Sequence, residues 1–232
     1  MFEDVIEGLD NVIETEIPKN SIILMAGSPG SLKSGLVYNM FSNYLAKNKK
    51  EFGIYVTLEE STESHLRNMQ SLGIKLPKNL LLSDYSDIRA RFEDKSHQLN
   101  LIQMLEGMIE HFKDEKGDEF SIFGFDSLNA LYALIDTTNI RIKMFHFFKG
   151  LREKGLTSVI IMELPEIFQA RSKLGSEFFL VDGIIKTGEI ESHQDVMLYM
   201  QVRKMRACRH SRKKHLVEVG KNGITILGPI FE

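Results

Sequence analysis

The chain has 232 residues and a mass of 26.6 kDa, a length typical of one α/β domain. Hydrophobic residues make up 43% and charged residues 26% of the chain, a composition that excludes wholesale disorder. With 29 lysines and arginines against 32 aspartates and glutamates, the net charge of −3 excludes a bulk electrostatic attraction to nucleic acid.

Apolar segments of strand length alternate with amphipathic segments of helix length over the first 162 residues. The predicted strands are 21–26, 52–58, 80–82, 120–125 and 156–162. The predicted helices are 36–45, 62–72, 99–112 and 140–151. Because right-handed crossovers join such strands, the pattern predicts an α/β fold with a mainly parallel, twisted sheet. The strands are apolar throughout, which predicts helices on both faces of the sheet.

The last sixty residues have a different pattern. Four strand-like segments follow one another with short turns, and Asn222-Gly223 is a hairpin signal. These segments are 181–187, 196–202, 215–219 and 223–227. They predict an antiparallel extension at one edge of the sheet.

The sequence has no signal for membrane insertion or secretion. No segment reaches the ~18 consecutive apolar residues of a membrane span, and residues 1–10 are acidic and lack the apolar core of a signal peptide. The single cysteine, Cys208, excludes a disulfide scaffold and fits a reducing compartment. We therefore expect a cytoplasmic protein that folds as one domain over residues 1–232.

The segment after the first predicted strand is typical of a loop that binds nucleotide phosphates. Such a loop turns backbone N–H groups toward phosphate, and the helix that follows adds partial positive charge. Lys33 would reach the terminal phosphates, and Ser34 would offer its hydroxyl to magnesium. The expected binding residues are Gly27, Ser28, Pro29, Gly30, Ser31, Leu32, Lys33 and Ser34.

Leu32 departs from the usual pattern of this loop, which has glycine before the lysine. Glycine tolerates left-handed backbone angles, whereas a leucine there costs roughly 1–2 kcal/mol. The fold could tolerate Leu32, or Leu32 could close the phosphate cradle. The simpler alternative is a strand-to-helix turn rich in glycine and serine.

Acidic residues follow three of the predicted strands. Glu59 and Glu60 follow the second strand and Asp126 ends the fourth, so their side chains should meet in the crevice at the carboxyl ends of the strands. The glutamates could hold and deprotonate an attacking water, or simply begin a helix. Asp126 on a buried strand needs a partner, either magnesium or the segment that it would cap. Glu163 ends the next strand and is a candidate for sensing phosphate.

Residues 203–215 are the most basic part of the chain. Considered alone, they could form a nucleic-acid patch or a solvated turn between two edge strands. The stretch has no interleaved aromatic residues and the chain is acidic overall, so we do not expect a nucleic-acid partner. His210 and His215 are five residues apart in a predicted hairpin, a spacing that does not indicate a metal site.

Six motifs occur in order along the chain. They are GLD at 8–10, GSPGSLKS at 27–34, YVTLEES at 55–61, FDSL at 125–128, VDGII at 181–185 and KMR at 204–206. On these motifs the chain resembles the KaiC-like branch of the RecA-superfamily P-loop ATPases, of the single-domain archaeal and bacterial type. The resemblance covers nearly the whole chain. Leu32 makes the Walker A loop degenerate, and Ala207 stands where the family usually has glycine.

The resemblance implies a RecA-like P-loop fold that binds ATP with Mg²⁺. Its Walker B motif would be 125–126, and Ser34 and Asp126 would hold the metal. Glu59 and Glu60 would be catalytic. The resemblance also implies a homo-oligomeric ring, a hexamer, with each site at a subunit interface. Lys204 and Arg206, together with His210, would then act on the nucleotide of a neighbouring subunit.

We favour an ATP-binding subunit of such a ring that hydrolyses ATP to ADP and phosphate and serves an unidentified protein client. The alternative is a non-catalytic nucleotide sensor or scaffold with a weakened phosphate loop, since Leu32 and Ala207 both replace glycines near the proposed phosphates. A third hypothesis is a DNA-repair accessory, because RecA relatives bind DNA.

Overall fold

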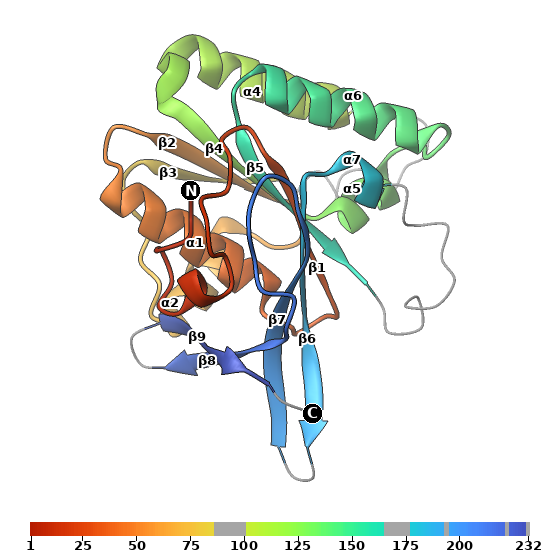
Figure 1. The fold of residues 1–232 in the computed structure, drawn as a ribbon. Helices are drawn as coiled ribbons and strands as arrows, with labels where there is room; N and C mark the ends of the chain where they lie inside the picture. The colour runs from red at the N-terminus through yellow and green to blue at the C-terminus, as the bar shows by residue number, and fades with distance from the viewer. Residues whose placement is uncertain (86–100, 165–176, 193–194, 221–222, 231–232) are drawn as a thin grey trace.

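The structure is a computed structural model that describes residues 1–85, 101–164, 177–192, 195–220 and 223–230. Its strands form one sheet in the order β3-β2-β4-β5-β1-β6-β7-β8-β9 (Figure 1). The strands are β1 (Ile22–Gly27), β2 (Phe52–Thr57), β3 (Leu80–Asp84), β4 (Phe120–Asp126), β5 (Thr157–Glu163), β6 (Gly183–Ser192), β7 (Asp195–Met205), β8 (His215–Gly220) and β9 (Gly223–Pro229).

The sheet has a parallel part and an antiparallel part. Strands β1 to β6 pair in parallel, with β1 at the centre between β5 and β6. Strands β6 to β9 pair in antiparallel order and form one edge. The prediction of a mainly parallel sheet with an antiparallel C-terminal edge is therefore confirmed.

Helices cover both faces of the sheet. The helices are α1 (Lys33–Lys47), α2 (Thr62–Ser71), α4 (Leu101–Lys116), α5 (Leu128–Leu134), α6 (Ile140–Glu153) and α7 (Glu177–Leu180), with short 3-10 turns at Leu9–Asn11 and Gly117–Glu119. Residues of α1 pack with Ile23 and Met25 on one face, whereas residues of α4, α5 and α6 pack with Ile22 and Leu24 on the other. The alternation along β1 divides the core into two layers, as the apolar strands predict.

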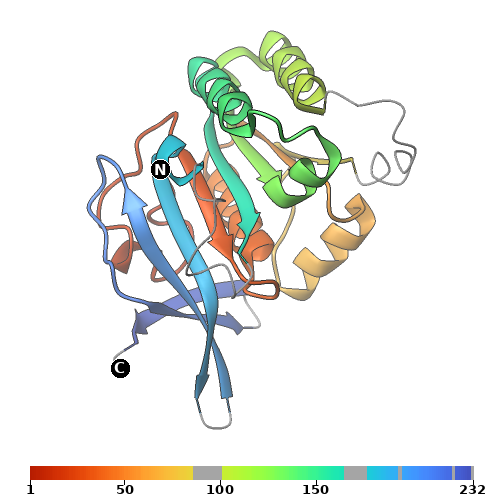
Figure 2. The same ribbon diagram turned by 90° about the vertical axis from the view of Figure 1, so that its right-hand side faces the viewer.

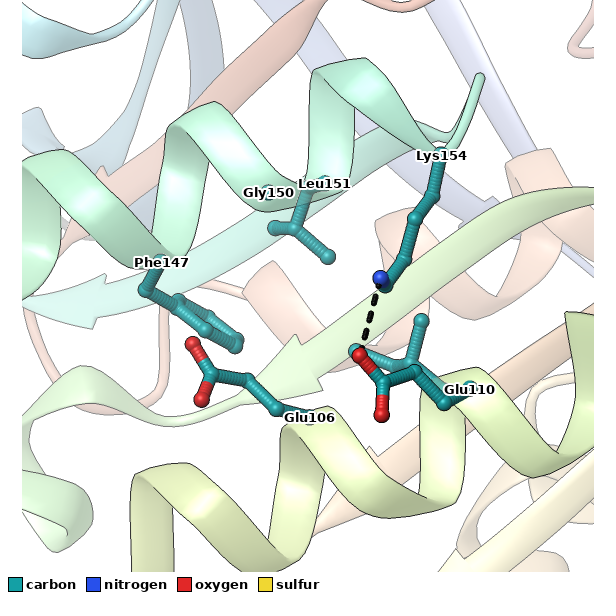
Figure 3. Close-up of a pocket in the computed structure, with 7 residues that line it drawn as sticks. Glu106, Glu110, Phe147, Gly150, Leu151 and Lys154 are labelled. Carbon is teal, nitrogen blue, oxygen red and sulfur yellow. Dashed lines mark hydrogen bonds and ion pairs between the residues drawn. The ribbon is translucent and has the colours of Figure 1, made fainter.

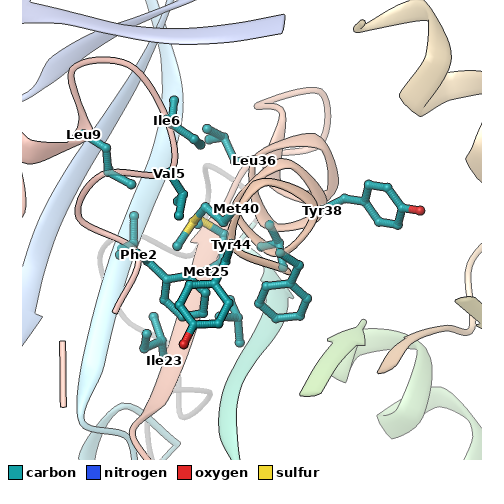
Figure 4. Close-up of a cluster of buried hydrophobic side chains, with 14 of the residues drawn as sticks. Phe2, Val5, Ile6, Leu9, Ile23, Met25, Leu36, Tyr38, Met40 and Tyr44 are labelled. Atoms are coloured by element: carbon teal, nitrogen blue, oxygen red, sulfur yellow. The ribbon is translucent and has the colours of Figure 1, made fainter. Parts of the chain in front are cut away.

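Three features go beyond the sequence prediction. Helix α5 follows β4 directly and was not expected. The N-terminal segment packs on α1, where Phe2 and Val5 join the core cluster (Figure 4), and the amide of Ile226 in β9 donates to Glu7 O at 2.8 Å. Strands β6 and β7 run past the end of β1 as a two-stranded ribbon (Figure 2).

Element boundaries differ from the prediction by a few residues. Helix α1 begins at Lys33, three residues before the predicted start, and β6 begins at Gly183, two residues after it. Residues 99–100 of a predicted helix and Asn222 of the predicted hairpin lie outside the described residues. Within those residues, no helix combines the length and apolar character needed to span a bilayer.

Candidate functional site

The parallel register brings the predicted acidic residues to the same end of the sheet as the phosphate loop. Gly27 at the end of β1 is paired with Glu163 at the end of β5, and Thr57 at the end of β2 is paired with Asp126 at the end of β4. The loop, the glutamates after β2 and Asp126 therefore lie at the same end of the sheet, where the sequence predicts a crevice.

Leu32 has the left-handed backbone that the loop pattern requires. Its φ of 66° and ψ of 21° lie in the region where glycine is usual, and Gly30 has a φ of 80°. The Leu32 side chain packs against the apolar cluster beneath α1. Gly35 leaves room for it, because a Cβ at Gly35 would lie 3.3 Å from Leu32 Cδ1. The packing of the Leu32 side chain thus accompanies the strained backbone that the sequence pattern predicts for this residue.

Ser31 links the phosphate loop to β6 by a hydrogen bond. Ser31 Oγ donates to Ser28 O at 2.6 Å and lies 2.8 Å from Thr187 Oγ1. Gly27 lies so close to Thr187 that a side chain there would collide with the β6 backbone. Sequence reasoning missed Thr187, because only the β1–β6 register reveals this contact.

Lys33 is buried inside the loop. Its ammonium donates to Ser28 O at 2.7 Å and lies 3.9 Å from Glu163 Oε1, and the residue is 6% exposed. Burial lowers the pKa of Lys33, against the opposing effect of the Glu163, Asp126 and Glu59 carboxylates. The ammonium of Lys33 is the group within the loop that suits an anionic ligand.

Asp126 is held by two hydroxyl groups. Its Oδ2 accepts hydrogen bonds from Ser34 Oγ at 2.7 Å and from Tyr55 OH at 2.8 Å. Burial raises the pKa of Asp126, and these two hydrogen bonds partly offset that rise. A serine hydroxyl beside a carboxylate is the oxygen donor set that Mg²⁺ uses together with phosphate oxygens and water, so these residues fit the ion.

Glu59 and Glu60 point to different places, although both backbone N–H groups donate to Thr57 Oγ1. Glu59 Oε1 accepts from Ser127 Oγ at 2.6 Å, next to Asp126. Glu60 instead accepts hydrogen bonds from the first turns of α2. The contacts are Ser64 Oγ at 2.9 Å and Asn68 Nδ2 at 2.8 Å, with His65 Nδ1 at 2.9 Å. The two glutamates predicted to act jointly are therefore separated.

Lys204 and Arg206 lie at the opposite end of the sheet from the loop. Lys204 Nζ donates to Val181 O at 2.6 Å, and Arg206 Nη1 donates to Asp182 Oδ1 at 3.2 Å. Asp182 in turn accepts from the amide of Ile22, the first residue of β1. Five residue steps of β1 separate Ile22 from Gly27, which corresponds to about 16 Å. One chain therefore does not bring these cations to its own phosphate loop.

The turn after β7 has a further left-handed residue. Ala207, which replaces the family's usual glycine, has a φ of 52°. His210 follows in an isolated antiparallel bridge to Ile13, and its Nδ1 lies 3.0 Å from Cys208 O. His210 thus packs against the N-terminal segment, and none of its described contacts is with the phosphate loop.

The described part of the chain includes a hollow at the phosphate loop and another between two helices. One borders the phosphate loop and is lined by Gly27, Ser28, Leu164, Lys186, Thr187, Gly188, Glu189 and Tyr199. The other lies between α4 and α6, where Lys154 Nζ contacts Glu110 Oε1 at 3.1 Å across its mouth (Figure 3). The second hollow lies between helices and away from the phosphate loop, whereas the first includes Gly27 and Ser28 of the loop.

Comparison with known proteins agrees with this geometry. A family model described as "ATPase: KaiC" matches residues 3–229. The chain belongs to the KaiC family of ATPases. The Circadian clock oscillator protein KaiC of Parasynechococcus marenigrum is 25% identical over 233 residues, which cover 95% of this chain and 43% of that protein. Circadian clock protein KaiC2 of Synechocystis is 25% identical over 231 residues, which cover 96% of this chain and 39% of that protein.

The chain thus spans less than half the length of these curated relatives. Among solved structures, the KaiC-like protein of the hyperthermophilic archaeon Pyrococcus horikoshii superposes with a TM-score of 0.81 at 24% identity, and the match covers 98% of each chain. That likeness confirms the RecA-like fold. Membership of the KaiC family supports an ATP-binding function of RecA type.

Proposed function

We propose that this KaiC-family chain binds ATP with Mg²⁺ at residues 27–34 and hydrolyses it to ADP and phosphate. The strongest support is Leu32, which has the left-handed backbone of the missing glycine and so leaves the path of the phosphate loop intact. The lone thiol of Cys208 supports a reducing compartment such as the cytoplasm.

The contacts suggest a role for each side chain in the crevice. The loop N–H groups and Lys33 bind the phosphates. Ser34 and Asp126 hold Mg²⁺, which neutralises phosphate charge when bound. Glu59 orients the attacking water and accepts its proton, because its carboxylate lies beside Asp126. Glu60, whose carboxylate is bonded to α2, has no part in this proton transfer.

We also propose that each site is completed by a neighbouring copy in a ring, with six subunits as the family resemblance implies. Lys204 and Arg206 are about 16 Å of strand length away from their own loop, so any action on a nucleotide would be on that of another chain. Arg206 is 58% exposed, and Phe179, which follows the residue whose carbonyl accepts a hydrogen bond from Lys204, is 72% exposed. An exposed guanidinium beside an exposed aromatic ring suits a subunit contact that delivers positive charge to a γ-phosphate.

Mixing two inactive variants tests this proposal. Lys33→Ala disables the phosphate loop, and Arg206→Ala disables the trans residue. In a random equal mixture, about one interface in four combines an intact loop with an intact Arg206. We expect each variant alone to lose ATP turnover and the mixture to regain about a quarter of wild-type turnover. An inactive mixture whose mass shows mixed rings would contradict action in trans.

A second candidate function is nucleotide binding without turnover. Lys33 is bonded to Ser28 O within the loop, a contact that a bound phosphate would have to displace. ATP affinity without any phosphate release, in rings of full mass, would favour this sensor or scaffold function. Salt-dependent retention on single-stranded DNA that is lost when Arg209, Arg212 and Lys213 are neutralised would instead favour a DNA-repair accessory.

A further inference from the structure

Three rings from different elements pack together behind the crevice. Tyr38 comes from α1, Tyr55 from β2 and His65 from α2, and all three residues are fully buried. The His65 ring lies 4.9 Å from both tyrosine rings, and the two tyrosine rings lie 5.5 Å apart. In Figure 4, Tyr38 leaves α1 on the side away from Phe2 and Val5. This ring cluster therefore joins α1, β2 and α2, and both of its tyrosines belong to the apolar core beneath α1.

The ring cluster has a polar contact at each end. His65 Nδ1 lies 2.9 Å from Glu60 Oε1, and Tyr55 OH donates to Asp126 Oδ2 at 2.8 Å. The path from Glu60 to Asp126 is thus continuous through His65 and Tyr55. Glu60 is at the α2 end of this path, and its other carboxylate oxygen, Oε2, accepts hydrogen bonds from side chains of α2.

Packing alone does not explain the polar atoms of this cluster. His65 Nε2 and Tyr38 OH are buried and have no hydrogen-bond partner among the described residues. Burying an unpaired polar group costs about 1–3 kcal/mol, whereas phenylalanine at either position would fill the same space without that cost. At position 65, the hydrogen bond between Nδ1 and Glu60 is a contact that imidazole can make and phenylalanine cannot. Tyr38 has no such bond and offers a matched control.

We propose that His65 and Glu60 are positioning residues that hold Tyr55, and through it the Asp126 carboxylate, in the orientation that binds Mg²⁺. The proposal rests on the Mg²⁺·ATP site proposed above. Glu60 fixes the His65 ring, the His65 ring fixes the Tyr55 ring, and Tyr55 OH fixes one oxygen of Asp126. Outer partners of this kind orient a metal-binding carboxylate and commonly change metal affinity by 10–100-fold.

The test compares His65→Phe with Tyr38→Phe. Both variants keep a ring in the cluster, but only His65→Phe removes the bond to Glu60. ATP affinity is titrated at increasing Mg²⁺ and again in EDTA, where Asp126 has no metal to bind. We expect His65→Phe to raise the Mg²⁺ concentration for half-saturation by about tenfold and to leave affinity in EDTA unchanged. Tyr38→Phe should match the wild type in both titrations.

Glu60→Leu covers the case in which His65→Phe does not fold, because leucine has no oxygen to accept a bond from His65. We expect Glu60→Leu to raise the Mg²⁺ requirement and to recover most of its turnover at saturating Mg²⁺. Glu59→Gln should instead lose turnover at every Mg²⁺ concentration. If the ATP affinity of the wild type does not depend on Mg²⁺, the proposed function fails as well. If that affinity depends on Mg²⁺ and the titrations of Glu60→Leu and any folded His65→Phe match the wild type, only the positioning role is overturned.

Discussion

Replacing Leu32 with glycine and with alanine separates the strain of its backbone from the packing of its side chain. A left-handed conformation costs a non-glycine residue about 1–2 kcal/mol. The side chain is half-buried against the cluster beneath α1, and complete burial of a leucine is worth about 1.5–3 kcal/mol. The packing that Leu32 contributes is therefore about 1 kcal/mol, close to the strain that it carries.

Leu32→Gly loses the packing and the strain together, so its free energy of unfolding should stay within about 1 kcal/mol of the wild type. Leu32→Ala loses most of the packing and keeps the strain. We expect the alanine variant to be less stable than the glycine variant by about 1–2 kcal/mol, the reverse of their order inside a helix. With a urea slope of about 2–3 kcal/mol/M, this difference separates the unfolding midpoints by about 0.5 M.

Equilibrium urea unfolding of the three proteins, with ATP titrations on the same samples, measures both effects. Because the backbone already has the glycine conformation, ATP affinity of Leu32→Gly should stay within about twofold of the wild type. An alanine variant as stable as the glycine variant would refute the left-handed conformation. Affinity that rises tenfold or more in the glycine variant would show that the leucine obstructs the phosphates.

Two further substitutions test the proposed magnesium site and the contacts of Asp182. Ser34→Ala removes a hydrogen bond to Asp126 and should abolish the Mg²⁺-dependent gain in ATP affinity while binding in EDTA persists, as calorimetric titration can show. Asp182→Asn should lower the free energy of unfolding at pH 7 by about 2 kcal/mol. Burial opposes ionisation of Asp182, but bonds from Ile22 N and Arg152 outweigh it and hold its pKa below the usual value. That stabilisation is present above the unfolded pKa of about 3.9 and is lost as pH falls through the folded pKa, so the urea midpoints of the two proteins should converge there.

Local pattern and turn chemistry were sufficient to predict the parallel core. Strands β1, β4 and β5 are apolar runs that end at Gly27, Asp126 and Glu163, and β2 ends two residues before Glu59, so the predicted site residues lie at or just after the strand ends. The positive φ of Leu32 followed from its place in the loop pattern. The α/β class and the crevice residues were therefore accessible from the sequence.

Contacts that depend on the pairing register of the strands could not be predicted from the sequence. Tyr55 reaches Asp126 because it is paired with Gly124, whose missing side chain leaves room for the tyrosine ring. A Cβ at Gly124 would lie 2.8 Å from Tyr55 Cδ2, so this glycine is a packing requirement rather than a turn. Thr187 and His65 were missed for the same reason, since each meets the site across tertiary contacts. The different hydrogen-bond partners of Glu59 and Glu60 likewise depend on how α2 packs.

The proposed function requires that residues 27–34 form a working nucleotide site despite Leu32. The most direct measurement is equilibrium binding of ATP with Mg²⁺ to the wild type and to Lys33→Ala, with oligomer mass recorded on the same samples. We expect micromolar binding by the wild type and a wild-type mass of several subunits. Removing the Lys33 ammonium should lower the affinity at least a hundredfold, or about 3 kcal/mol. Equal affinities in the two folded proteins, or no binding by a folded wild type, would contradict the proposed function.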